Sequence, residues 1–267
     1  MSKLSTQTFY DQRGQASMQA SQLAIGENIF PVYLREPYSF VSRLINNEFA
    51  HKEDRRLLDC CCGTGVHALG FAQMGYQVSG VDFSPDSILA AKKLEACFSL
   101  SNSISWLVAD ISTKLPCKDV FFDILFVSGS LYYFDLPTIF PEIKRVLKSH
   151  GLFCAIETNG DNFILNIWRR LKNRFAKHRD ERTLTKLLRR RDIEFIKREF
   201  PGLKIRYFGC FMLLGACFKR VPLLLRAWCF FARIVDWVLL DALKLRFLAF
   251  KFVLYGYNSK AKTGDIQ

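Results

Sequence analysis

The sequence predicts an α/β fold in which a mostly parallel β-sheet is sandwiched by helices. Three observations support this prediction: short apolar segments alternate with helical patterns between residues 56 and 160, half of all residues are apolar, and no heptad or internal repeat is sustained. Such alternation is typical of parallel sheets whose strands are joined by crossover helices. The 267 residues suffice for one large domain, and their apolar content excludes a chain disordered throughout.

Five strands are predicted in the core of the chain, which spans residues 51–160. Each has five to eight residues, is rich in β-branched or aromatic types and is bounded by turn-forming residues. They are RLLDC (56–60), YQVSGVD (76–82), ISWLVAD (104–110), FFDILFVS (121–128) and GLFCAIE (151–157). Parallel sheets bind ligands at the carboxyl ends of their strands, so functional residues are expected there.

Helices are predicted between these strands over residues 66–74, 85–96 and 137–148. Ser84 is placed to cap the second of them, since Pro85 stands at its first helical position. Residues 1–50 contain aromatic-rich helical patterns, such as FPVYLREPYSFVSRLI. They predict a helical cap over the strand ends.

Residues 161–203 are predicted to form a basic amphipathic helical insert. Apolar residues recur there at helical spacing, and basic residues occupy the opposite face. The apolar positions are Phe163, Ile164, Ile167, Trp168, Leu171 and Phe175, and the basic ones are Arg169, Arg170, Lys172, Arg174 and Lys177. A helix of this kind, with a tryptophan on its apolar side, is typical of attachment to a membrane surface.

Residues 204–257 are predicted to complete the sheet. Two strands, near KIRYFGCF and FLAFKFVLYGY, flank an apolar helix from Pro222 to about Leu245. That helix is apolar around nearly its whole circumference, which predicts deep packing or contact with lipid or an oily substrate. The last residues, 258–267, are expected to be a flexible tail.

The excess of basic residues lies entirely in the C-terminal part. Residues 1–160 hold 14 basic and 16 acidic residues, whereas residues 161–267 hold 24 and 9, which gives the formal net charge of +13. A negatively charged partner is expected to meet that part, and an anionic membrane surface along residues 161–250 fits this expectation. No DNA partner is predicted.

The sequence favours a cytoplasmic location, either free or peripheral at the inner face of the membrane. The N-terminal residues lack the apolar run of a signal peptide. The longest uncharged apolar stretch, Tyr207–Phe218, has 12 residues, against about 20 for a membrane-spanning helix. The nine cysteines contain no CxxC pair, so neither a disulfide framework nor a metal site is predicted.

The segment LLDCCCGTG carries the strongest functional signal. An apolar strand ends in Asp59 and enters a turn that contains Gly63 and Gly65, and a helix follows near Val66. Glycine lets the backbone approach a ligand closely, and the helix N-terminus offers unpaired N–H groups. This segment predicts a binding site for a polar or charged group.

Two more acids end the next two strands. Asp82 is suited to hold two ribose hydroxyls, and Asp110 is placed to accept a hydrogen bond from an adenine amino group. A dinucleotide site is disfavoured, because the glycines at 63, 65 and 70 do not fit GxGxxG. The pattern predicts a pocket for an adenosine with a polar tail.

Several motifs together resemble class I S-adenosylmethionine-dependent methyltransferases, and more narrowly their small-molecule and lipid-precursor branch (methyltransferase type 11-like). The resemblance covers about residues 55–160. It rests on Asp59 to Gly65, GVDFSPDSILAA (80–91), VADISTKLP (108–116), FDILFVSGSLYYF (122–134) and EIKRVLKSHGLF (142–153). It implies a Rossmann-like seven-stranded sheet and S-adenosyl-L-methionine as the cofactor.

The resemblance also implies roles for individual residues. The methionine part of the cofactor would be lined by Asp59, Cys61, Gly63 and Gly65. Asp82 would hold the ribose hydroxyls, Phe83 would pack on the adenine, Asp110 with Ile111 would read the adenine edge, and Ser128 would lie beneath the sulfonium. The sequence departs from the family at Cys61, where glycine is usual, and at Ser149 and His150, which replace Pro-Gly.

Candidate catalytic residues are sought at the carboxyl ends of the fourth and fifth strands. Tyr132, Tyr133, Glu157 and Asn159 stand there. Tyr10, in the sequence FYD, resembles the tyrosine that closes over the cofactor in related enzymes. Tyr10, Tyr133 and Glu157 are the hypothesised catalytic residues, and for His67, in the first turn after the glycine loop, a structural role is favoured over contact with the cofactor.

Three acceptor classes stay open. A lipophilic, membrane-associated acceptor fits the basic helix and the apolar region 222–245. A soluble metabolite or glycan precursor is the second reading. RNA is suggested by charge alone, and the fourth strand ends in VSGS, without the motif expected for methylation of base amino groups. A non-catalytic protein that only binds the cofactor is the alternative to an enzyme.

Overall fold

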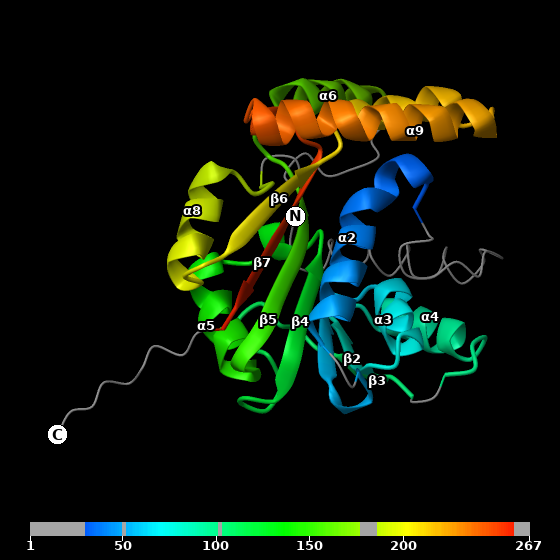
Figure 1. The fold of residues 1–267 in the computed structure, drawn as a ribbon. Helices are drawn as coiled ribbons and strands as arrows, with labels where there is room; N and C mark the ends of the chain where they lie inside the picture. The colour runs from blue at the N-terminus through cyan, green and yellow to red at the C-terminus, as the bar shows by residue number, and fades with distance from the viewer. Residues whose placement is uncertain (1–29, 50–51, 101–102, 177–185, 259–267) are drawn as a thin grey trace.

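The computed structural model describes residues 30–49, 52–100, 103–176 and 186–258, built around one seven-stranded sheet (Figure 1). The strand order is β3-β2-β1-β4-β5-β7-β6. Neighbouring strands from β3 to β5 are parallel, and β7 is antiparallel to β5 and β6. The strands are β1 (Arg56–Cys60), β2 (Gln77–Asp82), β3 (Ser105–Val108), β4 (Phe122–Ser128), β5 (Leu147–Thr158), β6 (Lys204–Phe208) and β7 (Lys251–Tyr257). The predicted α/β class is confirmed.

Helices cover both faces of this sheet, because alternate residues of each central strand point to opposite sides. Leu58 of β1 packs with α5 and α8, whereas its neighbour Leu57 packs with α2 and α3. The helices are α2 (Val32–Glu48), α3 (Val66–Gln73), α4 (Pro85–Glu95), α5 (Leu136–Val146), α6 (Phe163–Ala176), α8 (Arg190–Glu199) and α9 (Pro222–Trp237). Short turns of helix are η2 (Lys52–Asp54), η3 (Leu131–Tyr133), η4 (Phe211–Phe218), η5 (Val238–Ala242) and η6 (Arg246–Leu248).

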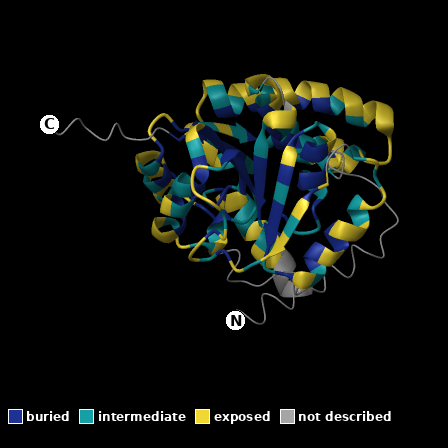
Figure 2. Cartoon of the chain, turned by 90° about the horizontal axis from the view of Figure 1, so that it is seen from below, coloured by how far each residue is buried: buried dark blue, intermediate teal, exposed yellow. Residues whose placement is uncertain are grey.

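The core lies on both sides of the central strands. Figure 2 shows the strands largely in dark blue and the outer sides of the helices in yellow. All of β4 except its last residue is buried. Continuous apolar strands are typical of parallel sheets covered on both faces, and this explains the uninterrupted apolar run from Ile124 to Val127.

The predicted cap of α4 is present. The hydroxyl of Ser84 accepts a hydrogen bond from the backbone N–H of Ser87 (3.1 Å), and Pro85 opens the helix. Pro85 has no N–H to leave unpaired, and Ser84 satisfies one of the free donors of the first turn. This cap fixes where β2 ends and α4 begins, directly beside Asp82.

Strand β5 starts four residues earlier than expected. The prediction began at Gly151 because Ser149 and His150 read as a turn, but Leu147 already pairs with Phe122 of β4. The register shifts after Phe122, and His150 adopts a positive φ of 61°. Strand β5 therefore contains a β-bulge, at which its backbone adopts a turn-like conformation.

The apolar helix predicted to reach about Leu245 ends sooner. Regular α-helix stops at Trp237, and the chain continues as a π turn, Val238–Ala242. The N–H of Leu243 donates to the carbonyl of Val238 (2.8 Å), and Lys244 follows with a positive φ of 57°. This left-handed residue prevents the helix from continuing.

Two of the expected peripheral segments form part of the core. Helix α2 lies along one face of the sheet, where Tyr38, Val41 and Ile45 are buried. The second half of region 161–203 forms α8, whose Ile193 and Ile196 are buried beside α5. Among the described residues of this region, α6 is the helix that has the predicted amphipathic character.

Candidate active site

The turn after β1 leaves space beside its backbone at Gly63. Its φ is 53°, and a Cβ placed there would meet no atom of the described residues within 4 Å, its two chain neighbours aside. The N–H of Gly63 donates to Oδ2 of Asp82 (2.9 Å), which joins this turn to the end of β2. A group could therefore lie directly on the backbone at Gly63, as the sequence predicts for a bound ligand.

Gly65 is explained by packing. Its φ is 75°, and an added Cβ would lie 2.4 Å from Cη2 of Trp106 and 2.8 Å from Cβ of Ala91. Trp106 of β3 thus presses against the start of α3. Gly65 positions the helix N-terminus, and its predicted contact with the cofactor stays a prediction.

Asp59 is buried at the end of β1 with one oxygen unsatisfied. Its Oδ2 has no hydrogen-bond partner among the described residues. Burial raises the pKa of this carboxyl well above its usual value, the charge of Asp82 adds to the rise, and the backbone N–H of Ala68 opposes it. A buried acceptor without a donor is costly, so a ligand that brings an ammonium or other donor would fit here.

The residues predicted to bind adenosine lie at the ends of β2 to β4. Asp82 is buried and also accepts the N–H of Ser84 (3.0 Å), and Phe83 beside it is half-buried. Asp110 is exposed and accepts the N–H of Ser112 (3.0 Å). Ser128 ends β4 and is half-buried.

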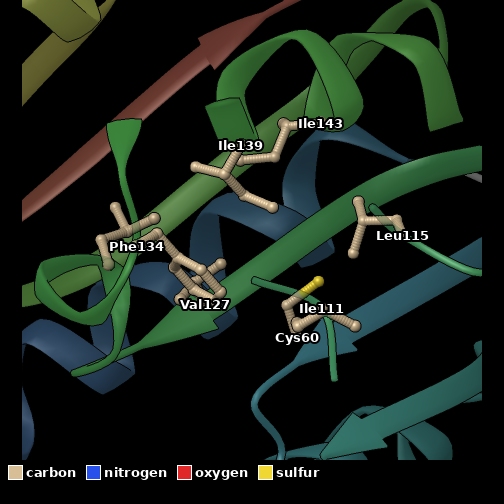
Figure 3. Close-up of a pocket in the computed structure, with 8 residues that line it drawn as sticks. Cys60, Ile111, Leu115, Val127, Phe134, Ile139 and Ile143 are labelled. Carbon is tan, nitrogen blue, oxygen red and sulfur yellow. The ribbon is translucent and has the colours of Figure 1, made fainter. Parts of the chain in front are cut away.

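Ile111 lines a small apolar hollow next to these strand ends (Figure 3). Its walls come from β1, β4, η3 and α5, and they are entirely apolar. The lining residues are Cys60, Ile111, Leu115, Val127, Leu131, Phe134, Ile139 and Ile143. The hollow lies within the core and is too small for a ligand the size of a base, so its residues contribute packing beside the strand ends.

Glu157 is fully buried at the carboxyl end of β5. Its Oε1 accepts the backbone N–H of Ser130 (2.9 Å) and that of Leu131 (2.8 Å), whereas Oε2 has no partner among the described residues. Burial raises the pKa of Glu157 to about 7, although these two N–H groups and the charge of Lys251 lower it. A carboxyl poised near neutrality can take up a proton and release it again.

The loop that Glu157 holds carries the two tyrosines. The rings of Tyr132 and Tyr133 lie 4.4 Å apart, and Tyr133 is partly exposed. Asn159 serves the fold instead of the site, since its Nδ2 donates to the carbonyls of Arg246 (3.0 Å) and Ala249 (3.1 Å). Tyr10 lies outside the described residues.

Cys61 fits the turn with some strain. Its φ of 57° lies in the left-handed region that favours glycine, which accounts for the glycine usual in similar sequences. Burial raises the pKa of the thiol well above its usual value, with a further contribution from Asp82, and a hydrogen bond with the side chain of Ser130 opposes the rise. Cys61 is therefore a neutral thiol between the glycine turn and the loop after β4.

Two residues of this region, His67 and Lys251, make contacts that the sequence does not predict. His67 stacks on Tyr38 (5.3 Å) and meets Phe126 edge-on (5.4 Å), and burial, followed by the charge of Lys251, lowers its pKa to about 4. Lys251 opens β7 and stands 5.5 Å from the ring of Tyr38. No motif marks Lys251, because a distant strand brings it to the site.

The sheet order with an antiparallel β7, the glycine turn after β1 and the acids at successive strand ends agree with the class I S-adenosylmethionine-dependent methyltransferase fold that the sequence predicts. Residues 58–155 match the family model described as a methyltransferase domain, so this part of the chain is a methyltransferase domain. The cofactor of this class is S-adenosyl-L-methionine. The fold and the cofactor agree with the expectation from the sequence.

Among curated proteins, the chain is similar to a 2-phytyl-1,4-naphtoquinone methyltransferase of Nostoc sp. The two are 34% identical over 150 residues, which are 52% of this chain and 65% of the relative. The match thus covers slightly less than two thirds of that relative.

Two solved structures share the fold over most of their length. One is that of the 4+2 cyclase SpnF, with a TM-score of 0.60, 18% identity and 96% of both chains covered. The other is a geranyl diphosphate C-methyltransferase from Streptomyces coelicolor, with a TM-score of 0.57, 17% identity and coverage of 84% of this chain and 77% of that one. At such identities the likeness concerns the fold alone.

Proposed function

We propose that the chain transfers a methyl group from S-adenosyl-L-methionine to a small lipophilic acceptor. One observation carries the proposal: among the described residues, a buried oxygen of Asp59 has no hydrogen-bond partner, and it lies near open space at Gly63, which is joined to Asp82. A positively charged ligand with a hydrogen-bond donor would satisfy Asp59 and occupy the space at Gly63. The residues present therefore fit the cofactor.

In this proposal, Asp59, Cys61, Gly63 and Gly65 hold the methionine part, and Asp82 holds the ribose. Phe83, Asp110 and Ile111 surround the adenine, and Ser128 lies beneath the sulfonium. The cofactor supplies an activated methyl group, whose donor leaves as a neutral sulfide. The protein then has to align the acceptor and exclude water, and good alignment is worth roughly 7 to 11 kcal/mol.

Glu157 is the proposed general base. Its Oε2, which has no partner among the described residues, can accept a proton from an acceptor hydroxyl, and its pKa of about 7 lets it do so near neutral pH. Oε1 is held by two backbone N–H groups, so the carboxylate keeps one orientation. Tyr133 is proposed to contact the acceptor, and Tyr10 to close over the cofactor.

The lipophilic acceptor is supported by the name of the Nostoc relative, which refers to a phytyl naphthoquinone. The enzyme would then work in the cytoplasm at the inner face of a membrane. The second candidate is a methyltransferase of a soluble metabolite or glycan precursor. RNA is a less favoured acceptor, which only the basic charge supports. A protein that binds the cofactor without turnover is the non-enzymatic alternative.

The test is transfer of a radioactive methyl group from the cofactor to a lipid extract, to a short-chain prenyl naphthoquinol and to a pool of soluble metabolites. Label in the lipid fractions that is lost in Glu157→Gln supports the proposal. Label only in the soluble pool favours the second candidate. Cofactor binding without label in any fraction would support the non-enzymatic alternative.

A further inference from the structure

Helices α6 and α9 turn their apolar sides outward. In α6, the stripe Phe163, Ile164, Ile167, Trp168 and Leu171 is 52–56% exposed. In α9, the stripe Leu223, Phe230, Ile234 and Trp237 is 52–77% exposed. We call these nine residues the apolar platform.

The inner side of α9 explains this orientation. Cys229, Ala232 and Asp236 are its buried residues, spaced so that they share one stripe. Two of them are small, and Asp236 accepts the backbone N–H groups at the start of η4, from Cys210 (3.1 Å) and Phe211 (2.6 Å). The helix is thus held by small residues and by a buried carboxylate, and its large apolar residues remain outside.

The platform has a fixed place in the fold. The ring of Phe163 in α6 stacks on Phe247 of η6 (6.2 Å), close after the end of α9. Arg233 of α9 forms an ion pair with Glu36 of α2 (3.2 Å). Figure 1 shows α6 and α9 at the end of the sheet where β4 and β5 finish, which is the edge that carries the candidate active site.

The exposed charged residues of α6 and of residues 211–248 are all basic. Helix α6 contains no acidic residue, and the acids between residues 211 and 248 are Asp236, which is buried, and Asp241, which is half-buried. The exposed basic residues of these elements are Arg170, Lys219, Arg220, Arg226, Arg233, Lys244 and Arg246. Large apolar side chains among exposed cations complement a surface that is apolar inside and anionic outside.

We propose that the apolar platform docks the protein on an anionic lipid bilayer, with Trp168 and Trp237 at interfacial depth. None of the helices in the described ranges has the length and apolar character needed to cross a membrane. Docking is therefore a surface attachment. This docking rests on the proposed function in one respect only. The edge of the sheet that carries the candidate active site would face the lipid from which a lipophilic acceptor enters.

The test is sedimentation of the full chain with vesicles of phosphatidylcholine alone, or with about a third of phosphatidylglycerol, at low and high salt. Binding is expected with the anionic vesicles and should weaken at high salt. The double variant Arg226→Gln/Lys244→Gln should bind about thirtyfold more weakly, because each basic residue near the surface is worth about fivefold. The variant Phe230→Gln/Trp237→Gln should lose at least about tenfold.

Leu89→Gln provides the control, because Leu89 is an equally apolar, 46% exposed residue on α4, outside the platform. It should bind like the unchanged protein, and circular dichroism should show that all variants fold. Equal binding by the platform variants and the control, or no binding to either vesicle, would overturn the proposal. So would a dimer in light scattering that Phe230→Gln/Trp237→Gln dissociates, since a second copy would then cover the platform.

Failure of docking can be distinguished from failure of the proposed function. Calorimetric titration with S-adenosyl-L-methionine in the absence of lipid reports on the cofactor site alone. Retained cofactor binding with no vesicle binding would reject the docking surface only.

Discussion

The backbone N–H of Gly63 donates to Oδ2 of Asp82 at 2.9 Å, so the loops after two adjacent strands form one unit. The same carboxylate accepts the N–H of Ser84, the cap of α4. Asp82 thereby joins the glycine turn to the start of α4. A change at this residue should affect cofactor binding first.

Gly63→Ala should weaken cofactor binding at a modest cost in stability. The positive φ costs an alanine about 1 kcal/mol, and there is no clash, because the space beside Gly63 is open. Gly202→Ala is a matched control, with a φ of 86° and equally open space just before β6 begins, away from the carboxyl ends of the strands. Titration with S-adenosyl-L-methionine should show an affinity loss for Gly63→Ala only; an equal affinity in both variants would mean that the space at Gly63 is not used.

Gly65→Ala should destabilise the fold strongly. A Cβ at this position would lie 2.4 Å from Trp106, and the backbone conformation adds strain. Overpacking and strain together predict a loss of about 2 to 4 kcal/mol in the free energy of unfolding. Urea denaturation measures it, and a loss no larger than that of Gly202→Ala would show that Trp106 moves aside.

Glu157→Gln should lower turnover by about a hundredfold at pH 8. The amide oxygen of the substituted side chain could still accept the N–H groups of Ser130 and Leu131, but the amide could not take up a proton. In the unchanged enzyme, turnover should rise with pH through about 7, as the raised pKa of the buried carboxyl is passed. A variant that retained this rise would place the base elsewhere.

The contribution of Glu157 to folding stability should change with pH in the direction opposite to turnover: it should fall as the pH rises. The pKa of Glu157 is higher in the folded protein than its ordinary value of 4.5, so its protonated form favours folding. Its contribution is present below pH 4.5 and is lost as the pH rises through about 7. Glu157→Gln should remove this part of the pH dependence in denaturation curves.

Tyr133→Phe should reduce turnover by about tenfold with little change in cofactor affinity. The phenylalanine ring can keep its place beside Tyr132, so only the hydroxyl is lost. Single-turnover measurements with saturating cofactor separate the two effects. Unchanged turnover would remove Tyr133 from the candidate catalytic residues.

The strands and their ends could be predicted because local patterns determine them. Asp59 and Asp82 follow apolar segments of strand length, and glycine marks the turn, so their common edge followed from the rule for parallel sheets. The burial of Asp59 and Asp82 and the exposure of Asp110 depend on packing across the sheet. The hydrogen bonds by which Glu157 holds the loop after β4 depend on it too. Such features arise from residues distant in sequence.

The orientation of α9 and the position of Lys251 could not be predicted. A helix that is apolar nearly all round gives no direction for its buried side, and here small residues such as Ala232 decide it. Lys251 reaches the neighbourhood of His67 through the antiparallel β7, which comes much later in the chain. Only the assembled sheet brings these two residues together.

Calorimetric titration with S-adenosyl-L-methionine tests the central claim most directly, with Asp82→Ala and Asp82→Asn beside the unchanged protein. We expect micromolar binding that Asp82→Ala reduces by at least about tenfold, because the charged acceptor is lost. Asp82→Asn keeps an acceptor for Gly63 and should preserve the turn while still weakening binding. No binding by the unchanged protein, or equal binding by all three, would contradict the proposed cofactor site.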